Sequence, residues 1–499
     1  MPPLPLLVFV VGMGSLGAEI AAVRLLAPYF GASTIVWANT IGIVLVALSI
    51  GYWLGGRLAD RRPELRSLCI VALIASCLLA AVPFVAGPLL DAGVEALDSV
   101  SAGAFVGSLL AVLVLLAIPV LMLGTVAPYA IRLAVTSLEE AGRVSGRLYA
   151  ISTAGSLVGT LSSSLLLIPL LGTRRTFLLY ALSIAVVALA GVWPRARYAA
   201  AVPLAIVALM VTPVGTLKAE TDNGRVIDEA DTEYQYARVI EREDGSRVLE
   251  LNEGHALHSL YRPDSVLTGG YWDGMLVAPF AGGDGRPPER VAILGNAAGT
   301  SARAYRELFP TTHVDGIEID AELSELGERW FDLQDVPNLE LHHQDARPYL
   351  RKTDRRYDVI AIDAYRQPYI PFYLSTREFF ELTRDRLAPG GVIVINIGHP
   401  EGQDQLEQVL SATIGAVFPN VMRYPYDETN TLVVAGDGPV SADKLRAAVG
   451  DLPGPLRPLA AEAADRAEPP LPGGEIYTDD DAPVEWLIDK SIVDYAGGS

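Results

Sequence analysis

The stretch VAILGNAAGT at residues 291–300 decides the fold of the second half of this 499-residue chain. An apolar run of strand length ends in a turn of small residues, and a helical pattern follows to about residue 308. A strand that turns directly into a helix is typical of a parallel sheet covered by helices. Small residues in such a turn let a ligand approach the backbone N–H groups at the helix start. We therefore predict that Gly295 and Gly299 bind a ligand.

The segments around this stretch continue the same alternation. Further strand patterns separated by helical ones occur at residues 313–319, 339–343, 358–362 and 392–397. They predict an α/β Rossmann-like domain over residues 286–437. Two strand patterns on either side of residues 243–246 predict a β-hairpin region within residues 216–285, and residues 438–499 form a C-terminal extension.

Carboxylates follow the predicted strands, where a sheet of this kind binds its ligands. The second strand ends at Glu318 and Asp320, the third at Asp345 and the fourth at Asp363. A carboxylate at the second strand end can accept hydrogen bonds from ribose hydroxyls. A structural role is the alternative for each one, for example Asp320 as a helix N-cap. The glycine turn is not a phosphate-binding GxxxxGK[ST] and holds no Lys or Arg, so an S-adenosylmethionine-like nucleoside fits better than ATP.

The first 215 residues have a different composition. The whole chain is 51% hydrophobic and 19% charged, and a bilayer crossing needs about 20 apolar helical residues. Such stretches predict a multi-span α-helical membrane domain over residues 1–215, with the lipid bilayer as its partner. We expect seven spans, at about residues 4–29, 33–56, 67–88, 102–131, 147–172, 175–193 and 197–214.

Charge separates the two halves and orients the first one. Residues 1–215 contain 12 Arg, no Lys and 8 Asp or Glu, a net charge of +4, so the remainder of a chain of net charge −20 carries −24. Without a basic surface, we expect no nucleic-acid binding. Nine arginines fall in one set of loops, against Arg174 and Arg175 in the other, which places the N-terminus in the cytoplasm.

These expectations conflict on one point. Seven spans with a cytoplasmic N-terminus would place residue 216 outside the cell, whereas a nucleoside-dependent domain of a multi-pass cell-membrane protein is expected in the cytoplasm. We favour a miscounted span. Glu19 and Arg24 lie within the first span, where ionisable groups need a partner or a polar cavity. They form either a structural ion pair or part of a path for a charged substrate.

Most of residues 225–435 resemble the spermidine synthase family, and more closely its membrane-fused members, which join a transporter-like domain to a polyamine-synthase-like domain. The resemblance rests on the hairpin with Tyr234-Gln235 and VLELNEG at residues 248–254, on the glycine turn and on Glu318-Ile319-Asp320. It extends through DAYRQP at residues 363–368 and LSTREFF at residues 374–380. The implied fold is a Rossmann-like domain of the methyltransferase type with an N-terminal β-hairpin region.

The resemblance implies an enzyme, an aminopropyltransferase. The amine of putrescine, a small-molecule substrate, would attack the aminopropyl carbon of decarboxylated S-adenosylmethionine and release methylthioadenosine. Asp363 would be the base or amine anchor. Glu318 would bind ribose, Asp345 the adenine amino group, and Gln235 the side chain of the sulfonium ligand, with Asp320 beside them.

Aromatic residues complete the implied site. Tyr365, which we assign with Asp363 to catalysis, and Tyr369 belong to an aromatic cluster that would either wall an acceptor pocket or pack in the core. Tyr271 and Asp273 lie near the position of the family's amine-binding tyrosine and are predicted to bind the substrate. No metal is expected, because the sequence places no further metal ligands beside His342 and His343. The sequence leaves open whether two copies of the chain form a homodimer.

Departures from the family pattern keep other functions open. The glycine turn has no carboxylate, and Arg366 stands where the family has a second Asp and would repel a diamine. One alternative is therefore an S-adenosylmethionine-dependent transferase acting on a membrane-borne acceptor. Another is a non-catalytic polyamine sensor or transporter. The acidic segment at residues 478–485 would either coordinate a cationic substrate or fold back on the domain.

Overall fold

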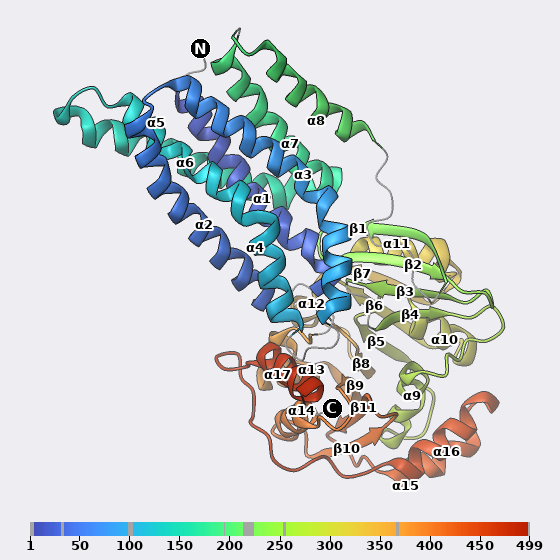
Figure 1. Cartoon of the computed structure of the whole chain (residues 1–499). Helices are drawn as coiled ribbons and strands as arrows, with labels where there is room; N and C mark the ends of the chain where they lie inside the picture. The colour runs from blue at the N-terminus through green and yellow to red at the C-terminus, as the bar shows by residue number, and fades with distance from the viewer. Residues whose placement is uncertain are drawn as a thin grey trace. The chain divides into compact units, whose positions relative to one another are not determined.

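The computed structural model describes residues 4–30, 34–97, 103–193, 195–212, 224–252, 256–365 and 369–497 (Figure 1). Contacts divide the chain into two compact units, each described here by itself. The first consists of Met1–Ala219 with Asp231–Tyr236, and the second of Glu220–Ala230 with Ala237–Ser499.

The first unit is a helical bundle. Its helices are α1 (Leu4–Phe30), α2 (Thr34–Arg61), α3 (Leu65–Leu97), α4 (Gly103–Gly124), α5 (Val126–Ala134), α6 (Ala141–Ser162), α7 (Ile168–Val192) and α8 (Ala201–Val211), with a π-helical turn at Ser163–Leu167. Small residues let α1 and α6 approach closely: a Cβ on Gly155 would lie 2.1 Å from the Phe9 carbonyl oxygen, and one on Gly159 2.1 Å from that of Met13. Such backbone contact is typical of helices that pack within a bilayer.

The number of crossing-length segments differs from the expected seven. Five apolar helical stretches are long enough to cross a membrane by length and composition. The fifth, Leu138–Val192, has 55 residues and breaks at Gly172, whose φ of 78° and ψ of 165° are not helical. Gly172 lies within α7, so the stretch holds two crossing-length segments, one before and one after this residue. The expected seventh span is described only as a short helix, α8, whose 11 residues rise about 17 Å against a hydrocarbon core of about 30 Å. The expectation of seven spans stays a prediction, since the end of the seventh, residues 213–214, lies outside the described residues.

Arg24, within α1, has an ionic partner. The Arg24 Nη2 lies 3.1 Å from the Asp231 Oδ1, and the Thr173 hydroxyl donates to the other oxygen of the same carboxylate at 2.5 Å. These residues all belong to the first unit. The expectation of a partner for Arg24 is confirmed, and that partner is Asp231 rather than Glu19.

The second unit contains a small sheet and a large one. The small sheet has the order β1 (Arg225–Asp231), β2 (Tyr236–Glu241), β3 (Arg247–Leu251) and β4 (Leu257–Tyr261), although residues 231–236 group with the first unit. β2 and β3 form the predicted hairpin. Helix α11 (Ala321–Trp330) packs on this sheet through Leu323 and Leu326.

The large sheet has seven strands in the order β10-β11-β9-β8-β5-β6-β7. Their bounds are β5 (Arg290–Leu294), β6 (His313–Glu318), β7 (Leu339–His343), β8 (Tyr357–Ile362), β9 (Leu387–Gly398), β10 (Asn420–Pro425) and β11 (Asn430–Gly436). β5 to β9 pair in parallel, and β11 is antiparallel to both β9 and β10. The chain moves outward from β5 first to β6 and β7 and then, on the other side, to β8 and β9. The resulting switch point beside β5 is where such sheets bind ligands.

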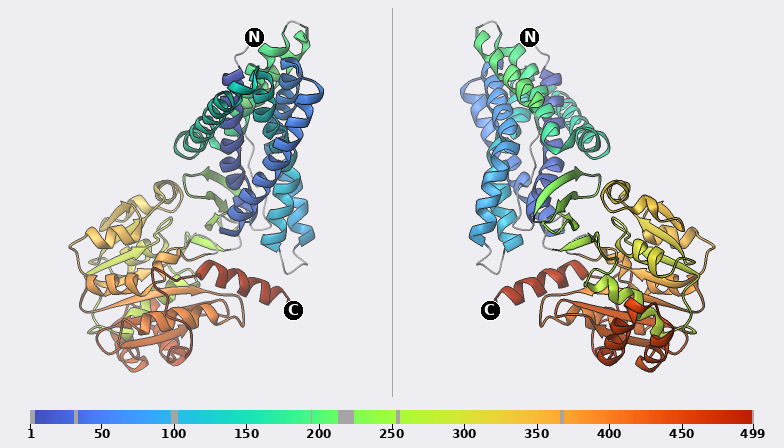
Figure 2. Two further views of the ribbon diagram at one scale, coloured as in Figure 1. Left: turned by 90° about the vertical axis from the view of Figure 1, so that its left-hand side faces the viewer. Right: turned by 90° about the vertical axis from the view of Figure 1, so that its right-hand side faces the viewer.

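Helices cover both faces of this sheet (Figure 2). Val291 and Ile293 face one core with α9 (Tyr271–Val277), α10 (Thr300–Leu308), α15 (Ala442–Ala448) and α16 (Arg457–Arg466). Ala292 and Leu294 face a second core with α12 (Ala346–Lys352), α13 (Arg377–Arg386), α14 (Gln405–Gly415) and α17 (Val484–Gly497). Burial on both faces explains why these strands read as continuous apolar runs. The predicted α/β architecture is confirmed.

Candidate active site

The glycine turn after β5 has an unusual backbone. Gly295 and Gly299 have φ of 88°, and Ala297 between them has φ of 44°, so the turn contains three left-handed positions. A Cβ on Gly295 would lie 2.4 Å from the Asp363 carbonyl oxygen. Because only glycine adopts this conformation without strain and fits this space, the turn lies directly against the end of β8.

Glu318, at the end of β6, is fixed by the same turn. Its Oε2 accepts a hydrogen bond from the Ala297 N–H at 2.8 Å, and its Oε1 accepts one from the Asp320 N–H at 3.0 Å. The residue is 6% exposed. Burial raises its pKa to about 7, although both backbone hydrogen bonds act in the opposite direction. The carboxylate is thus held next to the turn and keeps lone pairs for further donors.

Asp320 and Asp345 begin helices. The Asp320 carboxylate accepts from the Glu322 N–H at 3.2 Å, and the Asp345 carboxylate accepts from the Arg347 N–H at 2.8 Å. The N-cap interpretation of Asp320 is therefore confirmed. Asp345 has a second contact, because its Oδ2 accepts a hydrogen bond from the Tyr373 hydroxyl at 2.6 Å. This contact joins the start of α12 to the loop at residues 369–376.

Asp363, at the end of β8, is held by side chains from other elements, among them Tyr271 and Asn396. The Tyr271 hydroxyl, at the start of α9, donates to Oδ2 at 2.9 Å. The Asn396 Nδ2, near the end of β9, lies 3.1 Å from Oδ1. Removal from water raises the pKa of this partly buried carboxyl to about 7, and the hydrogen bonds from Asn396 and Tyr271 oppose the rise. A carboxyl with a pKa near neutrality can both hold an ammonium and take its proton.

Sequence reasoning missed Asn396. It is 3% exposed, and its Oδ1 has no hydrogen-bond partner among the described residues. The available signal was a lone amide in the otherwise apolar run VIVINIG at residues 392–398. A polar side chain in a buried strand needs a partner, but the partner became visible only once β8 and β9 were paired.

Tyr365 makes two hydrogen bonds with the end of β9. Its hydroxyl donates to the Asn396 carbonyl oxygen at 2.9 Å and accepts from the Gly398 N–H at 2.7 Å. Burial raises its pKa above the usual value. Its catalytic role stays a prediction, and in this geometry the hydroxyl orients the backbone beside Asp363.

Three other predicted positions also remain predictions. The Asp273 carboxylate accepts three hydrogen bonds from residues 268 and 269 in the loop before α9. Tyr369 is 5% exposed and belongs to the core beneath α12 and α13. Gln235 lies in the short segment grouped with the first unit, where its N–H donates to the Thr232 hydroxyl. Arg366 lies outside the described residues.

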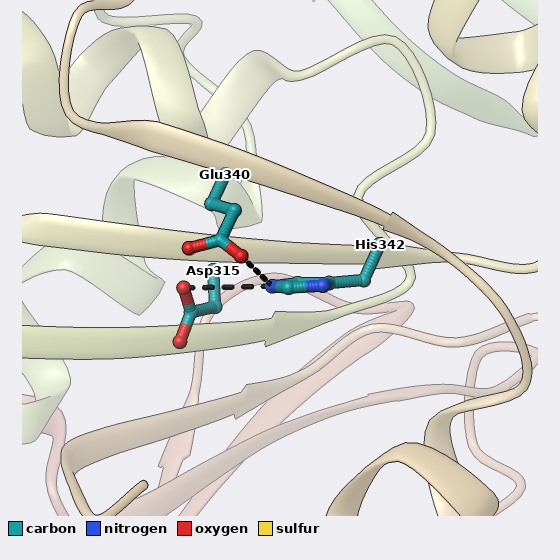
Figure 3. A group of neighbouring side chains, drawn as sticks. All are labelled: Asp315, Glu340 and His342. Atoms are coloured by element: carbon teal, nitrogen blue, oxygen red, sulfur yellow. Dashed lines mark ion pairs between the residues drawn. The ribbon is translucent and has the colours of Figure 1, made fainter.

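The structure also gathers a group that the sequence did not reveal, Asp315, Glu340 and His342 (Figure 3). The His342 Nε2 lies 3.6 Å from an oxygen of each carboxylate. The argument that no other metal-ligand side chains lie beside His342 was therefore wrong. The pairing of β6 with β7 places Asp315 opposite Glu340, and both carboxylates lie near His342. Arg355 spans both carboxylates, at 2.7 Å from Asp315 and 2.8 Å from Glu340. A guanidinium in this position opposes a divalent cation, so we interpret the group as an ion-pair network.

The fold and site define a Rossmann-like α/β domain with acidic side chains at the switch point of its sheet. Residues 275–432 match the spermine/spermidine synthase domain. A probable polyamine aminopropyl transferase of Bifidobacterium longum is 32% identical over 293 residues, 54% of this chain and 64% of that protein. The polyamine aminopropyltransferase of Vibrio vulnificus is 35% identical over 153 residues, 30% of this chain and 50% of that protein.

The chain thus spans between half and two thirds of the length of these relatives. A solved structure, a probable spermidine synthase from Corynebacterium glutamicum, is 20% identical and has a TM-score of 0.39. The similarity covers 53% of this chain and the whole of that one. The match to the spermine/spermidine synthase domain includes Glu318, Asp345 and Asp363.

Proposed function

We propose that the chain is an aminopropyltransferase that moves an aminopropyl group from decarboxylated S-adenosylmethionine to putrescine or a related amine. The observation that carries this proposal is Asp363, a carboxyl of raised pKa held by Tyr271 and Asn396 beside the glycine turn. The similarity of residues 275–432 to the spermine/spermidine synthase domain supports it.

The chemistry requires a deprotonated amine. Its nitrogen forms a bond to the aminopropyl carbon next to sulfur, and the bond between that carbon and the sulfur breaks. The sulfur keeps the electron pair of the broken bond, so methylthioadenosine leaves as a neutral thioether. Asp363 takes the proton that the amine loses. Because a bound ammonium lowers the pKa of a neighbouring carboxyl, binding of the substrate favours the ionised form of Asp363. Tyr271 and Asn396 keep both of its oxygens in place, so the reaction depends chiefly on orientation.

The nucleoside would occupy the ends of β5, β6 and β7. Glu318, held by the turn, accepts hydrogen bonds from the ribose hydroxyls, and Asp345 accepts one from the adenine amino group. Both carboxylates already accept backbone hydrogen bonds and have lone pairs left. The left-handed turn lets the sulfonium side chain pass close to the backbone at Gly295.

One observation favours a second candidate, transfer from ordinary S-adenosylmethionine to a membrane-borne acceptor. The turn carries no carboxylate to pair with an aminopropyl ammonium. It carries Asn296, which is 5% exposed and whose side-chain oxygen and nitrogen have no hydrogen-bond partner among the described residues. A side-chain amide can donate a hydrogen bond to a carboxylate as well as accept one from an ammonium. Asn296 is therefore compatible with ordinary S-adenosylmethionine, which has a carboxylate, as well as with the decarboxylated compound.

We further propose that the first unit spans the cell membrane. The five apolar stretches, with the fifth divided at Gly172, supply six crossing-length segments in the described part of the chain. An even number of crossings returns the chain to the side on which it began. The second unit would then share the cytoplasm with the N-terminus, in agreement with the arginine distribution and with an intracellular sulfonium substrate.

The test is a competition between the two donors. The full-length protein in detergent is mixed with putrescine and equal amounts of decarboxylated and ordinary S-adenosylmethionine, and the products are identified by mass spectrometry. We expect methylthioadenosine and spermidine from the wild type and from Asp385→Asn, a control at an exposed aspartate, but not from Asp363→Asn. S-adenosylhomocysteine would favour the second candidate. Nucleoside binding without any product would favour a sensor or transporter.

A further inference from the structure

The acidic segment near the C-terminus folds back onto the second unit. A tight turn joins the Thr478 N–H to the Asp481 carbonyl oxygen at 3.0 Å, with the reverse bond at 3.1 Å. Just before it, the Tyr477 carbonyl oxygen accepts from the Arg377 N–H at 2.8 Å. Of the two expectations for this segment, folding back is the one the structure bears out. The segment lies outside residues 275–432, which match the synthase domain.

Asp479 is the residue through which this segment contacts the site. Both of its carboxylate oxygens pair with the guanidinium of Arg347, at 2.7 and 2.6 Å. The hydroxyl of Thr376 donates to Oδ1 at 2.8 Å. The Arg347 side chain is 12% exposed and that of Asp479 is 47% exposed. Two parallel charge-assisted bonds fix the guanidinium plane as well as its position.

Arg347 in turn connects two residues of the candidate nucleoside site. It follows Asp345 by two residues, and its backbone N–H donates to the Asp345 carboxylate at 2.8 Å. Its Nη1 also donates to the Tyr373 carbonyl oxygen at 3.0 Å, while the Tyr373 hydroxyl donates to the Asp345 Oδ2 at 2.6 Å. These bonds form a closed ring through Asp345, Arg347 and Tyr373, and Asp479 holds the ring from outside.

We propose that Asp479 is a positioning residue of the nucleoside site, which fixes Asp345 and Tyr373 through Arg347 and Thr376. The inference deepens the proposed function and rests on it for the identity of the ligand. A long arginine side chain loses rotamer freedom when it is held, and the fork to Asp479 compensates for that cost. Without the fork, the guanidinium turns to solvent and the Tyr373 carbonyl oxygen loses its donor. Because both oxygens of Asp479 already accept hydrogen bonds from Arg347, direct coordination of a cationic substrate is the weaker interpretation.

The primary test compares Asp479→Asn with Asp480→Asn, the same change at the exposed neighbouring residue. Binding of methylthioadenosine to the full chain in detergent is measured by calorimetry. We expect Asp479→Asn to raise Kd about tenfold, in keeping with a partly exposed ion pair that has ideal geometry, and Asp480→Asn to leave Kd unchanged. If the transferase is active, KM for the donor rises while kcat at saturation stays within about twofold. A residue that binds the amine would instead change KM for the acceptor.

A second readout requires no ligand. Amide hydrogen exchange at residues 345–352 and 369–376 should be faster in Asp479→Asn than in the wild type and Asp480→Asn, and Asp479→Glu should restore part of the protection. The double variant with Arg347→Gln should lose no more affinity than Arg347→Gln alone, since the two residues act together. Unchanged exchange with unchanged Kd would overturn the inference. If the wild type binds no nucleoside, the proposed function fails, and the exchange rates alone decide the positioning role.

Discussion

Replacing Tyr271 by Phe removes the hydroxyl that lies 2.9 Å from the Asp363 Oδ2 and leaves the ring in place. This hydrogen bond lowers the pKa of Asp363, which burial has raised to about 7, so its loss raises the pKa further. A hydrogen bond to a charged group is worth about 1.5–3 kcal/mol, and one pKa unit corresponds to about 1.4 kcal/mol. The pKa of Asp363 should therefore rise by about one to two units.

The expected effect depends on pH. At pH 7 the ionised fraction of Asp363 falls from about half to between roughly one tenth and one hundredth, so kcat/KM falls about 5- to 50-fold. Near pH 9 the variant recovers to within about twofold of the wild type, because at least about half of the carboxyl is ionised again. The assay is methylthioadenosine release between pH 5.5 and 9.5 with putrescine as acceptor.

The comparison variant is Tyr365→Phe. Its hydroxyl hydrogen-bonds to the backbone at Asn396 and Gly398 and donates nothing to Asp363. The pH at which kcat/KM falls should therefore be the same in Tyr365→Phe as in the wild type. A uniform loss of rate at every pH in Tyr365→Phe would support the predicted catalytic role of this residue. A pH limb that does not move in Tyr271→Phe would refute the reasoning about Asp363.

Three further predictions follow from single positions. Burial raises the pKa of Glu318 from 4.5 to about 7, so its contribution to stability is complete below pH 4.5 and falls by ~3 kcal/mol as pH rises through 7. Glu318→Gln should therefore melt at a temperature that changes less between pH 5 and 8 than that of the wild type, and an identical pH dependence would contradict this. Gly295→Ala, with its Cβ 2.4 Å from the Asp363 carbonyl oxygen, should lose at least tenfold in nucleoside affinity, whereas Gly415→Ala, which meets nothing within 4 Å, should bind normally. Zn²⁺ or a chelator should leave the melting temperature unchanged because Arg355 already spans Asp315 and Glu340; a rise with Zn²⁺ would show a metal site there.

The residues at strand ends could be predicted because they depend on local pattern. Apolar runs of strand length locate β5 to β9, and parallel pairing brings their carboxyl ends together, so Glu318, Asp345 and Asp363 were found from the sequence. Asn396 and the hydroxyl of Tyr271 reach Asp363 only through the pairing of β8 with β9 and the packing of α9. Sequence spacing does not contain that information.

The errors have similar physical causes. Hydropathy counts apolar residues but does not show that α8, the helix described within the seventh expected span, has only 11 residues. The partners of His342 come from register, because Asp315 and Glu340 are 25 positions apart in the chain and adjacent across β6 and β7. The ion pair between Arg347 and Asp479 joins residues 132 positions apart. Contacts of this kind are properties of the folded unit.

The central claim is that Asp363 serves the attack of an amine on an aminopropyl sulfonium. The most direct measurement is putrescine-dependent release of methylthioadenosine from decarboxylated S-adenosylmethionine by the full-length protein, compared among the wild type, Asp363→Asn and Asp385→Asn. Equal amounts of methylthioadenosine and spermidine from the wild type and the control, with a loss of at least about 100-fold in Asp363→Asn, is the predicted result. Release that Asp363→Asn leaves intact, or a folded wild type that binds the donor and forms no spermidine, would contradict the account.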